Sequence, residues 1–226
     1  MFRLDLMTLD DLPDVGRVER RCFTNPWPQS AYRRELRYPE QNYYVVLRDC
    51  DGQGATAAAG RPDAPRRALT RLVSSIARKP EDAPVAPALA GFAGMWVMYD
   101  EAHVTTIGVD PLYRGQGWGE LLLVALFEEA IRRRASLLTL EVRVSNVTAQ
   151  RLYEKYGMSV QGIRARYYTD NGEDAYIMWS RSLRDPQFLT RFEDLRRTVL
   201  SRLETRLSDS PIISREPNVE LPDIAQ

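Results

Sequence analysis

The sequence predicts an α/β fold in which helices flank a mixed central sheet within one main domain. Three observations predict it. Short runs rich in β-branched and aromatic residues indicate strands, longer segments with apolar residues at helical spacing indicate helices, and the two kinds are interleaved along the chain. The 226 residues, 44% hydrophobic and 27% charged, suffice for one globular domain with some length left over.

The first fifty residues predict two strands and two helices. Residues 2–6 alternate in the manner of a short strand, and residues 10–13 begin a helix with acidic residues and a proline in its first turn. The prolines within residues 24–28 end that helix, and residues 30–36 predict a second, shorter one. Residues 43–47 are aromatic and β-branched, which is typical of a strand.

A change of composition at residue 51 predicts an insertion between two strands. Residues 51–90 hold five of the 14 prolines, many alanines and a single apolar cluster at 69–76. Such a segment buries too little apolar surface to pack as a core. We expect a low-order insertion, for which a solvated loop is the simplest interpretation.

Order resumes at Gly91, where most of the remaining sheet is predicted. Strand and helix patterns follow one another, and the turn Asp170-Asn171-Gly172 joins the last two strands as a hairpin. In chain order these are strands at 91–99 and 103–109, a helix at 119–135, a strand at 137–144, a helix at 146–156, and strands at 160–168 and 175–180.

The end of the chain predicts a helix and a tail. Asp185 and Pro186 begin the helix, whose apolar residues recur at helical spacing. Three further prolines from residue 208 on predict disorder. The chain therefore divides into a main domain at 1–181, an amphipathic helix at 182–207 and a disordered tail at 208–226. Packing of the helix on its own domain is favoured over a role as a docking surface.

Charge and cysteine content exclude several classes of function. Lys plus Arg equals Asp plus Glu, at 31 each, so no overall basic field favours nucleic acid or an anionic membrane. Charges interrupt the first apolar run, unlike in a signal peptide, and no run of about 18 apolar residues could span a bilayer. Two cysteines and one histidine are too few for a disulfide framework or a histidine-rich metal site. We expect a cytoplasmic protein without a metal, a nucleic-acid partner or a membrane anchor, and the oligomeric state stays open.

A glycine-rich turn between a strand and a helix is the most informative stretch. It runs from Val109 to Gly119, and Arg114 is followed by Gly-Gln-Gly-Trp-Gly. Glycines let a backbone approach an anion closely, and the first N–H groups of a helix lack internal partners and carry the positive end of the helix dipole. The turn therefore predicts a diphosphate site, to which Arg114 adds a full charge. The alternative is a glycine-rich connection without a ligand.

The spacing of the glycines narrows the class of ligand. The pattern Gly-x-Gly-x-Gly differs from the dinucleotide motif Gly-x-Gly-x-x-Gly, and no Gly-Lys-Ser/Thr follows as in a P-loop. Arg-x-x-Gly-x-Gly between a strand and a helix is similar to the motif with which GNAT-type acetyltransferases bind coenzyme A. The backbone of residues 105–109, in the preceding strand, could pair with the amide-rich pantetheine arm, while the side chains of Ile107 and Val109 belong to the core.

Glu141 and Tyr153 are the candidate base and acid. Glu141 lies in mid-strand, where glutamate is unusual. It is either half of an ion pair, with Arg143 or with a residue of a neighbouring strand, or a general base whose pKa partial burial raises. Tyr153 is either a core aromatic or a phenol that protonates a departing thiolate of similar basicity. Asn146 can cap the helix of Tyr153, and it could also reach a coenzyme.

No other set of residues competes for catalysis. Cys22 lies on a helix face with apolar neighbours and has no identifiable base, which predicts a buried structural thiol. His103 lies at the start of a strand and is expected at the surface or at the strand end. Direct attack of an amine on a bound thioester needs no enzyme nucleophile, so the missing nucleophile agrees with acetyl transfer.

Taken together, these segments resemble the GNAT superfamily of N-acetyltransferases, and within it the RimI-type ribosomal-protein-alanine N-acetyltransferases. The resemblance covers about residues 1–49 and 89–181 and implies the GNAT fold. Gly108 stands where the family more often has alanine, and the insertion and the residues after 182 are additions. The segments that carry the resemblance are 22–27, 107–111, 114–119, 140–143, 145–146, 152–154, 166–168 and 175–178.

The resemblance also implies roles for these residues. Glu141 matches the family's proton acceptor and Tyr153 its proton donor. The family it resembles transfers acetyl directly from acetyl-CoA to the N-terminal alanine of a small-subunit ribosomal protein. The acetyl-CoA contacts match Ile107, Gly108, Val109, Gly115, Gln116, Gly117, Trp118, Gly119, Glu120 and Asn146, with Arg114 beside them.

A difference in free energy favours an α-amine as the acceptor. Near pH 7.5, deprotonating an α-amino group of pKa about 7.7–8.0 costs under about 1 kcal/mol, whereas a lysine of pKa about 10.4 costs roughly 4 kcal/mol. We therefore expect a protein N-terminus as the substrate. A small-molecule amine or a lysine as substrate, and a non-catalytic coenzyme A-binding module, stay as alternatives.

Overall fold

The computed structural model describes residues 1–50 and 88–207. Most of the predicted insertion and the predicted tail at 208–226 lie outside the described residues. Residues 88–90, which the sequence analysis placed in the insertion, instead begin a strand. Ala88 and Leu89 pair with Asp49 and Arg48 of the neighbouring strand, so the strand predicted at 91–99 begins three residues earlier.

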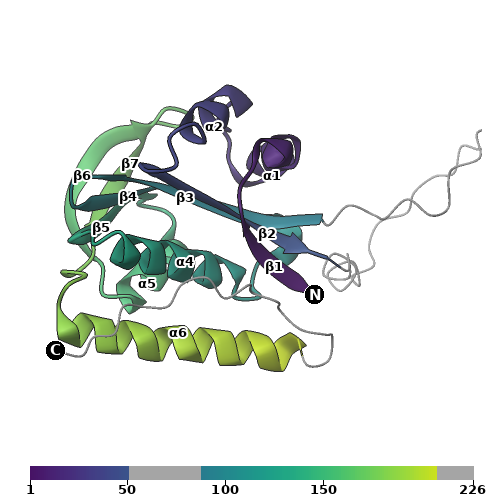
Figure 1. Cartoon of the computed structure of the whole chain (residues 1–226). Coiled ribbons are helices and arrows are strands. Elements are labelled where there is room, and N and C mark those ends of the chain that lie inside the picture. The colour runs from purple at the N-terminus through teal and green to yellow at the C-terminus, as the bar shows by residue number, and fades with distance from the viewer. Residues whose placement is uncertain (51–87, 208–226) are drawn as a thin grey trace, which may run out of the picture.

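The fold is built on one seven-stranded sheet with the strand order β1-β2-β3-β4-β5-β7-β6 (Figure 1). Neighbouring strands are antiparallel except β4 and β5, which are parallel, so the predicted mixed sheet is confirmed. The strands are β1 (Phe2–Leu6), β2 (Asn42–Asp49), β3 (Ala88–Met98), β4 (Glu101–Val109), β5 (Leu137–Arg143), β6 (Ser159–Tyr168) and β7 (Glu173–Trp179).

Helices cover both faces of this sheet. Figure 1 shows α1 and α2 on one face and α4, α5 and α6 on the other, with α6 as the outermost layer. Two short 3₁₀ turns, at Leu9–Asp11 and Pro111–Tyr113, precede α1 and α4. The helices are α1 (Leu12–Cys22), α2 (Gln29–Glu35), α4 (Trp118–Arg132), α5 (Val147–Lys155) and α6 (Pro186–Leu207).

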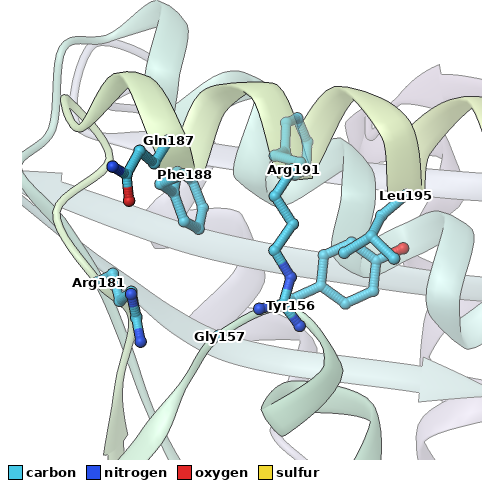
Figure 2. A pocket seen from close by; sticks show the side chains of 8 residues that line it. Tyr156, Gly157, Arg181, Gln187, Phe188, Arg191 and Leu195 are labelled. Carbon is cyan, nitrogen blue, oxygen red and sulfur yellow. The ribbon is translucent and has the colours of Figure 1, made fainter.

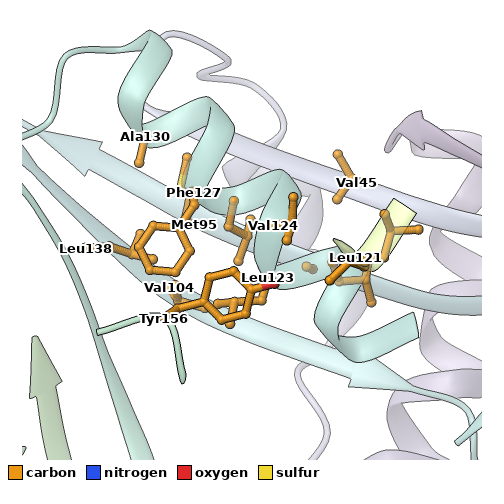
Figure 3. Close-up of a cluster of buried hydrophobic side chains, with 14 of the residues drawn as sticks. Val45, Met95, Val104, Leu121, Leu123, Val124, Phe127, Ala130, Leu138 and Tyr156 are labelled. Atoms are coloured by element: carbon orange, nitrogen blue, oxygen red, sulfur yellow. The ribbon is translucent and has the colours of Figure 1, made fainter. Parts of the chain in front are cut away.

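The main core lies between the sheet and α4. Residues 121–127 of α4 are all buried, and a helix that is apolar on every side must be covered on every side. Figure 3 shows Leu123 and Phe127 of α4 within the cluster of buried side chains that includes Val104 and Leu138 from the strands. Burying one such Leu or Phe side chain stabilises the fold by roughly 1.5–3 kcal/mol. This layer therefore holds the start of α4, where the glycine-rich turn ends, in a fixed position.

α6 covers the side of α4 that the sheet leaves open. The rings of Phe188 and Phe192 lie 5.8 and 5.6 Å from the ring of Phe127, measured between centroids. Val199 and Leu203, further along the same face of α6, are fully buried. The apolar face of this helix therefore packs on its own domain, and it is not available as a docking surface.

Candidate functional site

β4 and β5 diverge shortly after they begin to pair. Their pairing runs from Glu101 to His103, opposite residues 137–139, whereas the pairing of β4 with β3 continues to Val109. Among the described strands, none pairs with the β5-facing edge of β4 beyond His103. Gly108 lies on this stretch, and a Cβ there would come within 2.9 Å of the Phe92 ring, which gives a steric reason for glycine. The predicted backbone site at residues 107–109 thus lies where the sheet opens.

The glycine-rich turn connects this opening to the start of α4. Asp110 caps the 3₁₀ turn, with its Oδ1 atom accepting from the Leu112 N–H at 2.9 Å. Gly115 and Gly117 then adopt φ angles of +74° and +95°, in the left-handed region that glycine enters without strain. Gly117 is the N-cap of α4, and its carbonyl accepts from the N–H groups of Glu120 and Leu121 at 3.1 Å each. The turn therefore has the backbone conformation expected of an anion-binding turn at a helix N-terminus.

The side chains of this turn differ in what they face. Arg114 is exposed, and its Nε atom donates to the Val109 carbonyl at 3.0 Å. Trp118 is instead buried, stacks on Phe2 with ring centroids 4.1 Å apart, and donates from Nε1 to Gln116 at 3.2 Å. Any contact of Trp118 with a coenzyme would therefore come from its backbone.

Glu120, also predicted as a coenzyme contact, has its carboxylate in a structural network. Tyr156 donates to Oε1 at 2.9 Å, Lys155 contacts the same oxygen, and Arg202 of α6 donates to Oε2 at 2.6 Å. Burial raises the pKa of Glu120, but the hydrogen bonds from Arg202, Lys155 and Tyr156 outweigh it and hold the pKa below its usual range.

Glu141 projects from β5 with a side chain only 7% exposed. One carboxylate oxygen lies 3.1 Å from Nε2 of His103, and the other lies 3.2 Å from Arg164. Burial raises the pKa of this carboxyl, but the hydrogen bond and charge of His103 and the charge of Arg164 lower it further, so the net shift is downward. The raised pKa that the sequence analysis expected is therefore wrong. Of the two suggested sources of an ion-pair partner, Arg143 is wrong because it pairs with Asp170 and Glu173, whereas a partner on a neighbouring strand is confirmed by His103 of β4.

His103, which the sequence placed at the surface or at a strand end, instead contacts the candidate base Glu141. It is mostly buried, and its ring stacks on Trp96 with centroids 4.8 Å apart. Its Nδ1 atom lies 2.9 Å from Oγ1 of Thr139, whose hydroxyl proton is donated to Glu101. The ring therefore contacts two residues of β5, Glu141 through Nε2 and Thr139 through Nδ1.

Tyr153 and Asn146 belong to α5. Asn146 caps this helix, since its Oδ1 atom accepts from the Ala149 N–H at 3.2 Å, and its exposed position also leaves it open to a ligand. Tyr153 packs against the main core. Burial, and then the charge of Tyr168, raise the pKa of Tyr153, so its hydroxyl keeps its proton at neutral pH.

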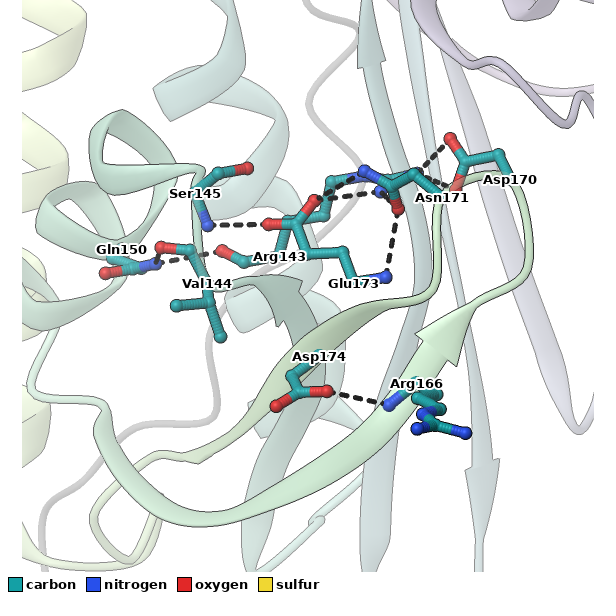
Figure 4. Close-up of polar contacts among 9 residues, drawn as sticks. All are labelled: Arg143, Val144, Ser145, Gln150, Arg166, Asp170, Asn171, Glu173 and Asp174. Atoms are coloured by element: carbon teal, nitrogen blue, oxygen red, sulfur yellow. Dashed lines mark hydrogen bonds and ion pairs between the residues drawn. The ribbon is translucent and has the colours of Figure 1, made fainter.

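Arg143 organises the loop that follows β6 (Figure 4). Its guanidinium binds both carboxylate oxygens of Asp170 at 2.9 and 2.8 Å, contacts Glu173 at 3.0 Å, and lies 3.8 Å from the centroid of the Tyr168 ring. Glu173 in turn accepts from the Ser145 N–H at 2.7 Å, which ties the hairpin to the segment before α5. This network fixes the β6–β7 turn beside the acid and base candidates.

The loop between α1 and α2 meets the same hairpin. Nδ2 of Asn25 donates to Thr169 at 3.0 Å, and the Trp27 N–H donates to buried Glu19 at 3.3 Å. Trp27 and Tyr167, from the two sides, are 37% and 42% exposed. The loop and the hairpin therefore each present a partly exposed aromatic side chain where they meet.

A family model described as the acetyltransferase (GNAT) family matches residues 12–158. The chain belongs to the GNAT family of acetyltransferases. The matched segment contains the glycine-rich turn, Glu141 and Tyr153, whereas α6 lies beyond its end.

Relatives of this GNAT acetyltransferase include ribosomal-protein enzymes. The ribosomal protein bS18-alanine N-acetyltransferase of Salmonella typhimurium is 45% identical over 180 residues, which cover 79% of this chain and 96% of the relative. The crystal structure of the ribosomal-protein-S18-alanine N-acetyltransferase from Escherichia coli matches with a TM-score of 0.58 at 29% identity, covering 81% of this chain and 94% of that chain. The NatC complex, solved with a Gag peptide and CoA, shares the fold at a TM-score of 0.57 and 17% identity, covering 80% and 98% of the two chains.

A groove of about 200 Å³ lies between the end of α5 and the start of α6 (Figure 2). Arg181 and Arg191 lie at this groove, beside the rings of Tyr156, Phe188 and Phe192. None of its lining residues is a predicted site residue of this GNAT acetyltransferase. The groove is therefore separate from the proposed chemistry.

The described residues show neither a metal cluster nor a membrane-spanning helix. Within residues 1–50 and 88–207, no group of three or more His, Cys, Asp or Glu side chains is placed to hold a metal ion. No helix of the same ranges is long and apolar enough to cross a bilayer.

Proposed function

We propose that this chain transfers the acetyl group of acetyl-CoA to the N-terminal α-amine of a protein, with the N-terminal alanine of a bS18-type ribosomal protein as its substrate. The observation that carries the proposal is the buried carboxylate of Glu141 beside the point where β4 and β5 diverge, one strand away from the glycine-rich turn. The names of the relatives support the choice of substrate. We assign the reaction to residues 1–181.

The coenzyme is assigned to the edge of β4 and the turn after it. The backbone of Ile107, Gly108 and Val109 would pair with the pantetheine arm, and Asn146 would contact the coenzyme from the start of α5. The phosphates would be bound by the N–H groups of residues 115–119, with Arg114 adding its charge, since the N–H of Glu120 already donates to the Gly117 carbonyl. Acetyl-CoA supplies the activated thioester, and the chain's own residues move the protons.

Glu141 is assigned as the proton acceptor. Its lowered pKa keeps it ionised at neutral pH, and for the same reason it is a weaker base than a carboxylate of raised pKa. A weak base suits an amine that is already partly neutral. An α-amine of pKa about 7.7–8.0 meets this condition near neutral pH, whereas a lysine does not. The downward pKa shift of Glu141 therefore strengthens the preference for a protein N-terminus.

Tyr153 is assigned as the proton donor to the departing thiolate. The raised pKa of Tyr153 keeps its hydroxyl protonated, but it also makes donation to a thiolate more costly than an unshifted phenol would. We therefore expect Tyr153 to contribute less to the rate than Glu141.

Mass spectrometry of acetylated peptides tests the substrate. The full chain is incubated with acetyl-CoA and either a peptide beginning with alanine or the same peptide with a blocked α-amine and one internal lysine. We expect acetylation of the free α-amine, with the blocked peptide unmodified and the Glu141→Gln variant inactive on both. Preferential acetylation of the blocked peptide at its lysine would contradict the proposed substrate.

A further inference from the structure

The last two turns of α6 lie against the glycine-rich turn. Arg206 donates from Nη1 to the Gly115 carbonyl at 3.5 Å. A Cβ added to Gly117 would lie 3.2 Å from Nη2 of Arg202 and 3.4 Å from Leu203. This end of α6 therefore borders the site to which the coenzyme phosphates are assigned, although α6 lies outside the segment that matches the family model.

The charges around the turn depend on α6. Glu120 places a negative charge in the first turn of α4, where it opposes the binding of an anion. Lys155 of α5 pairs with Glu120, so these two side chains together carry no net charge. Arg202 and Arg206 of α6 then add two positive charges beside the turn. The two arginines of α6 therefore add to the attraction that the N–H groups of the turn and Arg114 exert on a phosphate.

The positions of both arginines are fixed by the packing of α6. Leu203 and Leu207, which are adjacent in sequence to Arg202 and Arg206, are buried against the main core. Arg206 itself is exposed, and one contact to a carbonyl leaves most of the five N–H donors of its guanidinium for another acceptor. The guanidinium geometry suits a phosphate group, which it can bind through two parallel hydrogen bonds.

We propose that α6 forms a second wall of the coenzyme site, in which Arg206 binds a phosphate group of acetyl-CoA. This inference rests on the proposed function. Arg202 is a positioning residue: it holds the Glu120 carboxylate, and because Lys155 already balances that charge, Arg202 makes the net charge of the three side chains at the start of α4 positive. The added helix thereby takes part in binding the coenzyme as well as in covering the core.

Titration calorimetry on the full chain tests this arrangement. Acetyl-CoA and 3′-dephospho-acetyl-CoA are titrated into the natural chain and into the Arg206→Gln variant, each at low and high salt. We expect Arg206→Gln to raise the Kd for acetyl-CoA by roughly three- to tenfold at low salt, and by less at high salt because ions screen exposed charges.

Arg197→Gln is the matched control. Arg197 lies on the same helix and makes only i,i+3 and i,i+4 ion pairs with Asp194 and Glu193. Nine residues separate it from Arg206, which corresponds to about 13 Å along the helix and to the opposite face. We expect its Kd for acetyl-CoA to stay within about twofold of the natural chain, since it removes the same charge at a distance.

The comparison of the two ligands locates the phosphate. A loss of affinity for acetyl-CoA alone assigns Arg206 to the 3′-phosphate, whereas equal losses for both ligands assign it to the diphosphate; either supports the inference. An Arg206→Gln variant that binds both ligands as tightly as Arg197→Gln would overturn it while leaving the proposed function intact. Failure of the natural chain to bind acetyl-CoA at all would overturn the proposed function as well.

A second substitution tests the role of Arg202. Arg202→Gln should weaken acetyl-CoA binding and reduce its dependence on salt, and Arg202→Lys should restore both because it returns the charge to Glu120. Unchanged affinity and salt dependence in Arg202→Gln, with only a lower melting temperature, would show that Arg202 has a structural role alone.

Discussion

Glu120 and Glu141 are two largely buried carboxylates whose pKa values are both lowered, yet their surroundings differ. In both, burial raises the pKa and the surrounding donors outweigh it. The donors to Glu120 come from α5 and α6, which pack on the core. The partners of Glu141 are His103 on β4 and Arg164 on β6, whose side chain is 55% exposed.

Because Glu120 and Glu141 share both properties, burial and a shifted pKa do not by themselves identify a catalytic base. Structural ion pairs shift pKa values as effectively as active sites do. The difference lies in what can happen to the partners. Glu120 has the buried Tyr156 as one partner, and its two cations extend from helices that pack on the core. Glu141 instead lies where the strands diverge, next to Arg164, which is 55% exposed and could be displaced by an incoming ammonium group.

Replacing Glu141 has the largest expected effect. In Glu141→Gln, kcat for an alanine-terminated peptide at pH 7.5 should fall by about 10²–10⁴-fold, because the general base is lost. Kd for acetyl-CoA and the melting temperature should change little. Steady-state kinetics and calorimetry on the same preparation measure these quantities.

The pH dependence of the variant provides its internal control. Raising the pH from 7 to 9 should recover part of the activity, since the α-amine then arrives deprotonated without help. A variant with undiminished kcat at pH 7.5 would remove Glu141 from the mechanism.

Glu120→Gln is the matched substitution at the other carboxylate, and its effect should be on stability. We expect the free energy of unfolding at pH 7 to fall by about 1–2 kcal/mol, because Tyr156 and Lys155 lose a charged acceptor. This loss of stability is small because the side chains of Lys155 and Arg202 are 36% and 44% exposed, so that water screens their charges. The melting temperature should drop by roughly 2–8 °C, and a melting curve measures it.

The sign of the pH dependence of this stability follows from the pKa shift. The folded-state pKa of Glu120 lies below its usual value of 4.5, so its contribution is complete above that value and is lost as the pH falls through the folded pKa. Urea unfolding should therefore show the difference in stability between the natural chain and Glu120→Gln shrinking as the pH falls below about 5. A difference that widens on acidification would contradict the assigned network.

The sequence predicted what depends on neighbouring residues. The turn around Gly115 and Gly117, the strand of Glu141 and the cap at Asn146 each follow from a few adjacent residues and were placed correctly. The role of the turn and of Glu141 in catalysis still depends on the experiments above.

The missed features depend on residues that are far apart in the chain. His103 reaches Glu141 because β4 and β5 pair in parallel with His103 opposite Thr139, and no local pattern gives that register. The contact of Arg202 with Glu120 spans 82 residues and depends on how α6 packs. The shift in the pKa of Glu141 was predicted in the wrong direction. Its burial could be expected from the sequence, whereas its contacts with His103 and Arg164 could not.

His103→Gln has the smallest expected effect on the rate. It distinguishes Glu141 from Glu120 because only the pKa of Glu141 depends on His103. The imidazole lowers the pKa of Glu141, so its removal should raise that pKa and move the acidic limb of kcat/KM to higher pH. We expect kcat near pH 7 to fall by roughly three- to tenfold, because Glu141 loses a partner that fixes its orientation. A purely structural loss would lower the rate without moving the limb. In the Glu141→Gln background, His103→Gln should have no further effect on the acidic limb of kcat/KM, since the effects of two residues that act through one carboxylate are not additive. A second shift of equal size in that background would show that His103 acts independently of Glu141.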